Sequence, residues 1–229
     1  MGVFLFSLFA YAAGMSSLIF FFYSLKFGAN SIPSPFSWHV VMHNSLLFLV
    51  FPLQHSVLPR SFVKKQFGEY LHRPFYVATS GIALWIILLW WRPFGPYLYR
   101  NVADLFFDVL FYVCVLMIVL CTIELGHGKM FGLAQGIAAW KHLPLTQGEL
   151  KTTGMFGIVR HPITTLLIVV LWARGSLTAG SLLFNLLFTL YALLGTFLEE
   201  KALLAEMGDE YRDYRRKVPA FIPGFSRYR

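Results

Sequence analysis

The sequence has few charged residues. Asp, Glu, Lys and Arg make up 13% of its 229 residues, whereas hydrophobic residues make up 57% and aromatic residues 18%. A typical soluble domain has about a quarter of its residues charged, so this composition excludes an ordinary soluble protein. With a mean hydropathy of +0.63, the chain is predicted to be an integral membrane protein.

The chain also lacks any Gly/Ser-rich or charged linker, any internal repeat and any low-complexity tract. We therefore predict a single membrane domain over residues 1–229. It has only two cysteines, Cys114 and Cys121, seven positions apart on one predicted helix. That spacing is about 10 Å along a helix, beyond the reach of a disulfide. The first apolar run has no basic segment before it and no clear cleavage site, which predicts a retained first helix.

Apolar runs of spanning length occur at residues 2–25, 36–53, 75–91 and 104–125. Each is near the ~20 residues that cross a bilayer. Two more apolar segments, 163–173 and 177–198, are separated by a short turn and predict a C-terminal helical hairpin. The predicted fold is all-α, with about five to six transmembrane helices. Residues 1–125 hold four of them, and residues 126–229 hold a loop, the hairpin and a cytoplasmic C-terminal helix.

The positive charges are unevenly distributed between the two sides of the membrane. The net charge is +8, and fifteen of the 19 Lys and Arg residues fall in segments on one side under a six-segment topology. The positive-inside rule then places both termini of this multi-pass protein on the cytoplasmic side. We expect the membrane to be the cell inner membrane. This distribution predicts contact with membrane lipids and no binding of nucleic acid.

Polar residues bracket the predicted hairpin. Arg160 and His161 stand before Pro162, which suits the first position of a helix. The free N–H groups of that helix end and the Arg160 cation together suit a carboxylate or phosphate. Glu199 and Glu200 follow the second arm, so acid and base are expected to meet where the two ends of the hairpin come together.

These motifs resemble a known family. "RHP", the "EE" pair and "GDEYRDYRRKVPAFIP" resemble the membrane-embedded methyltransferases related to isoprenylcysteine carboxyl methyltransferase and phospholipid methyltransferase. The pieces "FPLQHSVLPRSFVKK", "RPFYVATSGIALWIILLWWRPF" and "MFGLAQ" narrow the likeness to the methanethiol S-methyltransferase and NnrU-like branch. Together they span most of the chain after residue 50.

The resemblance implies S-adenosylmethionine as cofactor, in a cytoplasmic pocket to which the 126–161 loop contributes. Arg160 would anchor the cofactor carboxylate, and the acidic and aromatic residues would balance its positive charge. The residues implied in cofactor binding are Arg160, His161, Pro162, Gln135, His127, Glu199, Glu200, Tyr211 and Tyr214. The implied catalytic residues are His161, Glu199 and His55, since a histidine can accept the proton of a thiol.

The predicted function is methylation of a small lipophilic thiol such as methanethiol, giving dimethyl sulfide. One alternative is methylation of a lipid-like acceptor, either a prenylated cysteine carboxyl group or a phospholipid amine. Another is a non-catalytic NnrU-like membrane protein, an alternative kept open by Thr164, Leu166 and Ala134, which depart from the residues usual in relatives.

Several polar residues also have a plain structural interpretation. The region of His55 is equally consistent with an interfacial loop that contacts lipid phosphates. Glu124 and His127, three apart, are predicted to pair on one helix face. His39 and His43 share a face but have no evident third ligand, so no metal site is predicted.

The tail from residue 199 to 218 has apolar residues at helical spacing and is predicted to form a separate helix on the membrane surface. Its charged residues are predicted to be solvated or to face lipid. They are Glu210, Arg212, Asp213, Arg215 and Arg216.

Overall fold

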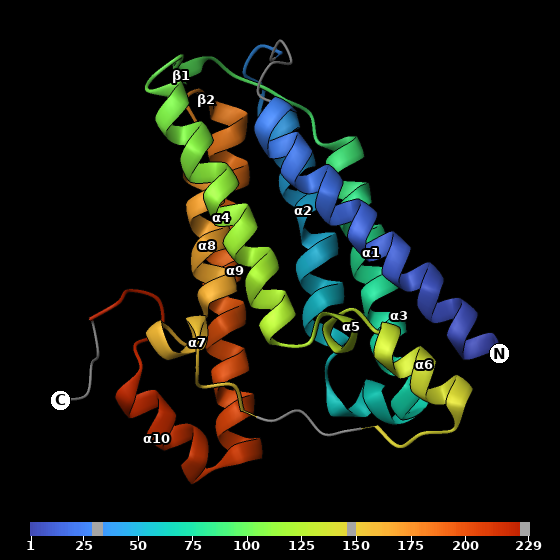
Figure 1. Ribbon diagram of the computed structural model, residues 1–229. Helices are drawn as coiled ribbons and strands as arrows, with labels where there is room; N and C mark the ends of the chain where they lie inside the picture. The colour runs from blue at the N-terminus through green and yellow to red at the C-terminus, as the bar shows by residue number, and fades with distance from the viewer. Residues whose placement is uncertain (29–33, 146–149, 225–229) are drawn as a thin grey trace. The chain divides into compact units, whose positions relative to one another are not determined.

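The computed structural model describes residues 1–28, 34–145 and 150–224, and these are mostly helical (Figure 1). Five helices within these ranges are long and apolar enough to cross a membrane. They are α1 (Gly2–Phe27), α2 (Trp38–Val57), α3 (Ser61–Trp90), α4 (Asp104–Glu124) and α9 (Ala179–Met207). A sixth apolar helix, α8 (Pro162–Trp172), is shorter. The prediction of an all-α multi-pass membrane protein is confirmed.

The remaining elements are short. They are the helices α5 (His127–Met130), α6 (Leu133–Lys141), α7 (Met155–Ile158) and α10 (Asp209–Lys217), and the strands β1 (Tyr97–Tyr99) and β2 (Leu177–Thr178), which pair antiparallel.

The chain divides into two compact units. The first comprises Met1–Arg100, Gly126–Gln147 and Ser176–Phe184, and the second comprises Asn101–Leu125, Gly148–Gly175 and Asn185–Arg229. The single domain over residues 1–229 stays a prediction.

Small residues hold α1 against α3 in the first unit. A Cβ added at Gly81 of α3 would lie 2.8 Å from the carbonyl oxygen of Ala13, and one added at Gly14 of α1 would lie 2.7 Å from Val77 Cγ1. A Cβ at either position would overlap its neighbour, so these contacts require glycine. The close approach of two backbones that glycine permits is one way in which membrane helices gain packing energy. Figure 1 shows α1 crossing α3 along much of its length.

The start of α3 differs from the predicted span at 75–91. The helix begins at Ser61 and contains a break at Gly68, whose φ of 70° is outside the helical range. Glycine tolerates positive φ because it has no Cβ. Residues 61–67 therefore form a short helix, and the spanning helix begins directly after the break at Gly68, before the predicted start at residue 75.

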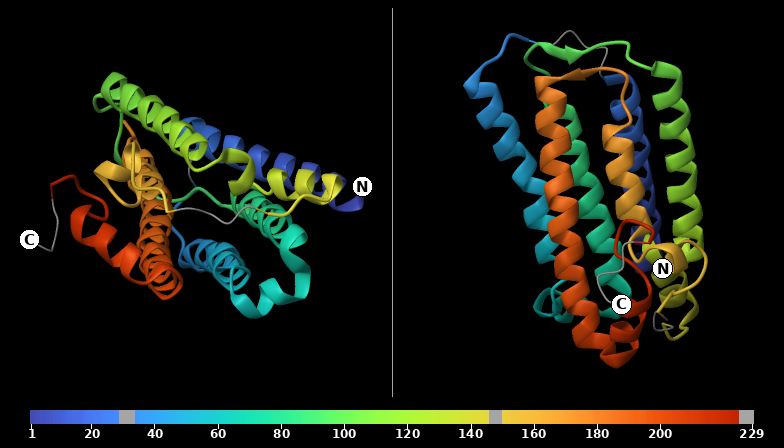
Figure 2. Two further views of the ribbon diagram at one scale, coloured as in Figure 1. Left: turned by 60° about the horizontal axis from the view of Figure 1, so that its bottom comes forward. Right: turned by 90° about the vertical axis from the view of Figure 1, so that its left-hand side faces the viewer.

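In the second unit, hydrogen bonds join the two arms of the predicted hairpin. Asn185 of α9 is fully buried, and its Nδ2 donates to the carbonyl oxygen of Leu171, 2.7 Å away. Trp172 Nε1 donates to Thr189 Oγ1 over 3.1 Å. Polar groups within an apolar hairpin favour such pairing over exposure to lipid. Figure 2 shows α8 leading into α9 through the segment that contains β2.

The tail was predicted to form a separate helix from Glu199, but it does not. α9 runs on to Met207, and the break lies at Gly208, whose φ of 58° ends the helix before α10. No glycine or proline lies between Gly195 and Gly208 to interrupt it. Glu199 and Glu200 therefore lie inside one helix, where neighbours point about 100° apart.

The packing of α1 on α3 gives a first prediction. Gly81→Ala places a methyl group against a backbone carbonyl, so we expect a loss of about 1–3 kcal/mol in the free energy of unfolding. Gly195→Ala is the matched control, since a Cβ there meets no atom within 4 Å. Thermal unfolding in detergent should show a lower midpoint for Gly81→Ala only, and equal midpoints for the two variants would contradict this packing.

Candidate active site

The segment before α8 is held by the segment after α10. The backbone N–H of Arg160 donates to the carbonyl oxygen of Pro219 at 2.8 Å, and that of His161 donates to Ala220 at 3.1 Å. α8 then begins at Pro162, as predicted, and the N–H of Thr165 bonds the carbonyl oxygen of His161. Two segments far apart in the sequence thus fix the position of the Arg160 and His161 side chains.

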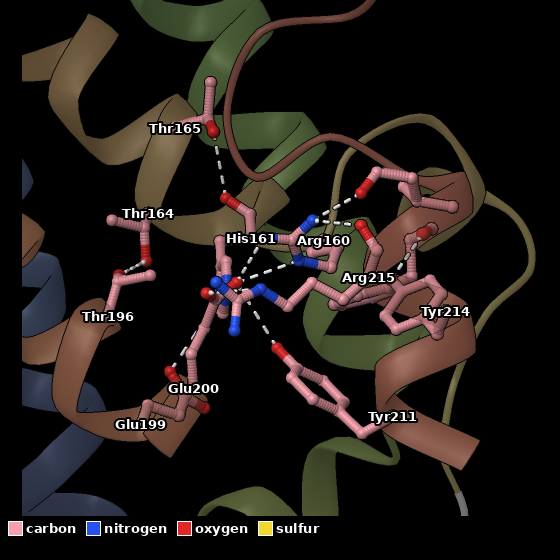
Figure 3. Close-up of polar contacts among 12 residues, drawn as sticks. Arg160, His161, Thr164, Thr165, Thr196, Glu199, Glu200, Tyr211, Tyr214 and Arg215 are labelled. Atoms are coloured by element: carbon pink, nitrogen blue, oxygen red, sulfur yellow. Dashed lines mark hydrogen bonds and ion pairs between the residues drawn. The ribbon is translucent and has the colours of Figure 1, made fainter. Parts of the chain in front are cut away.

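The Arg160 guanidinium joins three parts of the chain (Figure 3). Its Nε and Nη2 donate to Glu200 Oε1 at 2.8 and 2.5 Å, while its Nη1 donates to the carbonyl oxygens of Arg215 and Val218 at 3.1 and 2.5 Å. Both charged side chains are buried, with exposed fractions of 8% for Arg160 and 12% for Glu200. The predicted meeting of the two hairpin ends is confirmed.

The two neighbouring glutamates have different surroundings. Glu200 Oε1 also accepts hydrogen bonds from His161 Nε2 at 3.1 Å and from Tyr211 Oη at 3.4 Å. The Glu199 side chain is 61% exposed, and its Oε2 lies 3.8 Å from His161 Nδ1. Glu200 is therefore committed to internal bonds, whereas the carboxylate of Glu199 remains accessible.

His161 lies between these two carboxylates, and its side chain is 8% exposed. An ionised carboxylate only accepts hydrogen bonds, and the contact with Arg160 favours the ionised form of Glu200. His161 Nε2 must then carry a hydrogen to make its bond with Glu200. In the neutral ring, Nδ1 consequently keeps its lone pair and faces Glu199.

Tyr211 and Tyr214 of α10 pack into the same cluster, with 1% and 7% of their surface exposed. Tyr214 Oη donates to the carbonyl oxygen of Phe156 at 2.6 Å. Burial raises the pKa of Tyr214 to about 12, and burial likewise raises the pKa of Tyr211 above its ordinary value. Both phenols are therefore neutral hydrogen-bond donors at physiological pH.

His55 belongs to the first unit. Its Nε2 lies 2.6 Å from Tyr76 Oη and its Nδ1 lies 3.2 Å from Ser80 Oγ, which links α2 to α3. The ring also stacks on Phe51, with centroids 4.7 Å apart. Its catalytic role stays a prediction.

His127 and Gln135 also lie in the first unit, where His127 Nε2 lies 3.1 Å from Tyr11 Oη and Gln135 Nε2 donates to the carbonyl oxygen of Lys129 at 3.2 Å. Their roles in cofactor binding stay predictions.

The predicted sharing of one helix face by Glu124 and His127 is wrong. α4 ends at Glu124, and Gly126 with a φ of 84° separates it from α5. Glu124 Oε2 instead accepts the backbone N–H of Met155, 3.3 Å away.

Arg215 was not predicted as a site residue, because it was grouped with the solvated charges of the tail. Arg215 Nε lies 3.6 Å from Glu200 Oε2, and the side chain is 33% exposed. The available signal was helical phase, because residues three and four apart share one face of a helix. Tyr211, Tyr214 and Arg215 have that spacing on α10.

No family model matches the chain, and no solved structure matches it. In an alignment of 237 positions it is 31% identical to methanethiol S-methyltransferase 2 of Bradyrhizobium diazoefficiens, and the alignment covers 97% of this chain and 90% of that protein. It is 33% identical to methanethiol S-methyltransferase of Mycobacterium tuberculosis, covering 85% and 82% of the two chains. It is also 31% identical to nurim of Rattus norvegicus, over 69% of this chain and 65% of nurim.

The unequal burial of the two glutamates predicts unequal effects on stability. Glu200→Ala leaves the buried Arg160 guanidinium without its counter-charge, which should cost about 3–5 kcal/mol. Glu199→Ala removes an exposed carboxylate and should change stability by less than about 1 kcal/mol. Thermal unfolding in detergent compares the two neighbours directly, and a small, equal shift for both would show that the buried ion pair does not stabilise the protein.

Proposed function

Since the chain belongs to the family of membrane methyltransferases that includes the methanethiol S-methyltransferases, we propose that it methylates methanethiol to dimethyl sulfide, using S-adenosylmethionine. The observation that carries this proposal is the similarity to two proteins with that name over most of their length. The cluster around Arg160 and Glu200 supports it, since it provides charges of both signs in one place.

The charges of the cluster suit the cofactor. S-adenosylmethionine bears a carboxylate, an ammonium group and a sulfonium, and therefore needs both acidic and basic partners. Glu199 is the accessible carboxylate for one of the positive groups, since its side chain is 61% exposed. Glu200 acts indirectly by holding Arg160 and His161 in place.

The sulfonium supplies an electrophilic methyl group, and the acceptor must supply a thiolate. In the proposed reaction the S–H proton of methanethiol leaves, and the thiolate sulfur bonds the methyl carbon. The bond from that carbon to the sulfonium sulfur breaks, and its electron pair stays on that sulfur. His161 Nδ1, kept as an acceptor by the Nε2 bond to Glu200, is the proposed recipient of the proton.

The orientation in the membrane is part of the proposal. The excess of Lys and Arg on one side supports a cytoplasmic position for the hairpin ends, where the charged cofactor is available from water. A small lipophilic thiol partitions into the bilayer. The two substrates would then approach the same enzyme from different phases.

Purified protein in detergent tests the proposal. Calorimetry should detect binding of S-adenosylmethionine, and headspace analysis should detect dimethyl sulfide after methanethiol is added. Glu199→Gln should weaken cofactor binding about tenfold, because a contact between opposite charges is lost. Glu210→Gln, which changes an exposed carboxylate on α10, is the matched control and should bind like the wild type.

The outcomes separate donor from acceptor. A wild-type protein that binds no S-adenosylmethionine would refute the proposed cofactor. Binding without dimethyl sulfide would refute methanethiol as acceptor and direct the search to prenylated cysteine or phospholipid. Equal binding by Glu199→Gln and wild type would remove Glu199 from the cofactor site.

A further inference from the structure

The cluster contains two guanidinium groups, Arg160 and Arg215, which differ in how many of their N–H groups form hydrogen bonds within the protein. Arg160 has five N–H donors, of which four point at acceptors of the protein: two at Glu200 and two at main-chain carbonyl oxygens. The side chain is 8% exposed. Arg160 therefore has little capacity left for a ligand, and its contacts are those of a group that holds the site together.

Arg215 is the second guanidinium. It projects from the last turn of α10, and Figure 3 shows its side chain reaching toward Glu200 and His161. Its Nε lies 3.6 Å from Glu200 Oε2, and a third of the side chain is exposed. Among the contacts of the described residues, no hydrogen bond engages its two terminal nitrogens. These two nitrogens carry four N–H donors, and a third of the side chain is exposed.

We infer that Arg215 binds the carboxylate of the methionine portion of S-adenosylmethionine, an inference that rests on the proposed function. A guanidinium pairs with a carboxylate through two parallel hydrogen bonds, an arrangement that a single point charge does not reproduce. The Nε contact with Glu200 fixes the base of the guanidinium and leaves its outer edge for the ligand.

The surroundings of Arg215 suit an amino-acid zwitterion. His161 contacts the exposed acid Glu199 at 3.8 Å as well as Glu200, and Glu200 in turn contacts the partly exposed base Arg215 at 3.6 Å. A ligand with a carboxylate and an ammonium group on one carbon presents the same two charges. Arg160 is then a positioning residue, and Arg215 takes the anchoring role that the sequence predicted for Arg160.

The test uses two ligands that differ by one group: S-adenosylmethionine and its decarboxylated analogue. Calorimetry on the full-length protein in detergent gives both dissociation constants. Arg215→Ala should raise the dissociation constant of S-adenosylmethionine about 10- to 100-fold, because a charged hydrogen-bonding partner is lost. The same variant should bind the decarboxylated analogue within about twofold of wild type, because that ligand makes no carboxylate contact.

Two other arginines provide controls. Arg212→Ala, on the same helix and with a 56% exposed side chain paired with Asp209, should leave both dissociation constants unchanged. Arg160→Ala should weaken the binding of both ligands by the same factor, because it disturbs the whole cluster rather than one contact. Arg215→Lys, a second variant that keeps the charge beside Glu200, should recover part of the affinity for S-adenosylmethionine.

The inference is overturned if Arg215→Ala weakens both ligands equally or neither. It is also overturned if the wild type does not prefer the ligand with the carboxylate. Failure of the wild type to bind either ligand is a distinct result, which refutes the proposed cofactor and this inference with it.

Discussion

The buried ion pair between Arg160 and Glu200 is the interaction on which the second unit depends. A charge buried without its partner costs several kcal/mol, so the two ends of the α8–α9 hairpin must meet before either side chain is buried at acceptable cost. The remaining Arg160 donors then bind the carbonyl oxygens of Arg215 and Val218. One guanidinium therefore determines where α10 ends and where the following segment runs, and both provide the surroundings of His161.

Much of the fold could be predicted because its signals are local. Spanning length and hydropathy identified the membrane helices, and Pro162 after Arg160 and His161 marked the start of α8. The hairpin with acid and base at its ends predicted that Arg160 and His161 would meet the Glu199–Glu200 pair, since charges at the ends of apolar arms have few other partners. The resemblance of the motifs gave the family, which the relatives support.

Other features depended on helical phase and on single glycines, which composition does not reveal. Glu199 and Glu200 look equivalent in the sequence, but the uninterrupted α9 turns one into the cluster and leaves the other accessible. Arg215 was grouped with solvated charges because its sign was considered without its position relative to Tyr211 on α10. Gly68 and Gly126 also placed helix breaks that were not predicted. Hydrophobicity predicted a loop around Gly68, and the three-residue spacing of Glu124 and His127 predicted a shared helix face across Gly126.

The pairing of Arg160 and His161 with Pro219 and Ala220 has a consequence for biosynthesis. During translation the hairpin leaves the ribosome before the carbonyl groups that complete its polar end. Until Val218 to Ala220 are made, the nascent chain carries a membrane-inserted hairpin whose Arg160 lacks part of its hydrogen bonding. A chain released before Val218 would thus hold every apolar helix described here and still lack part of the hydrogen bonding that completes the site.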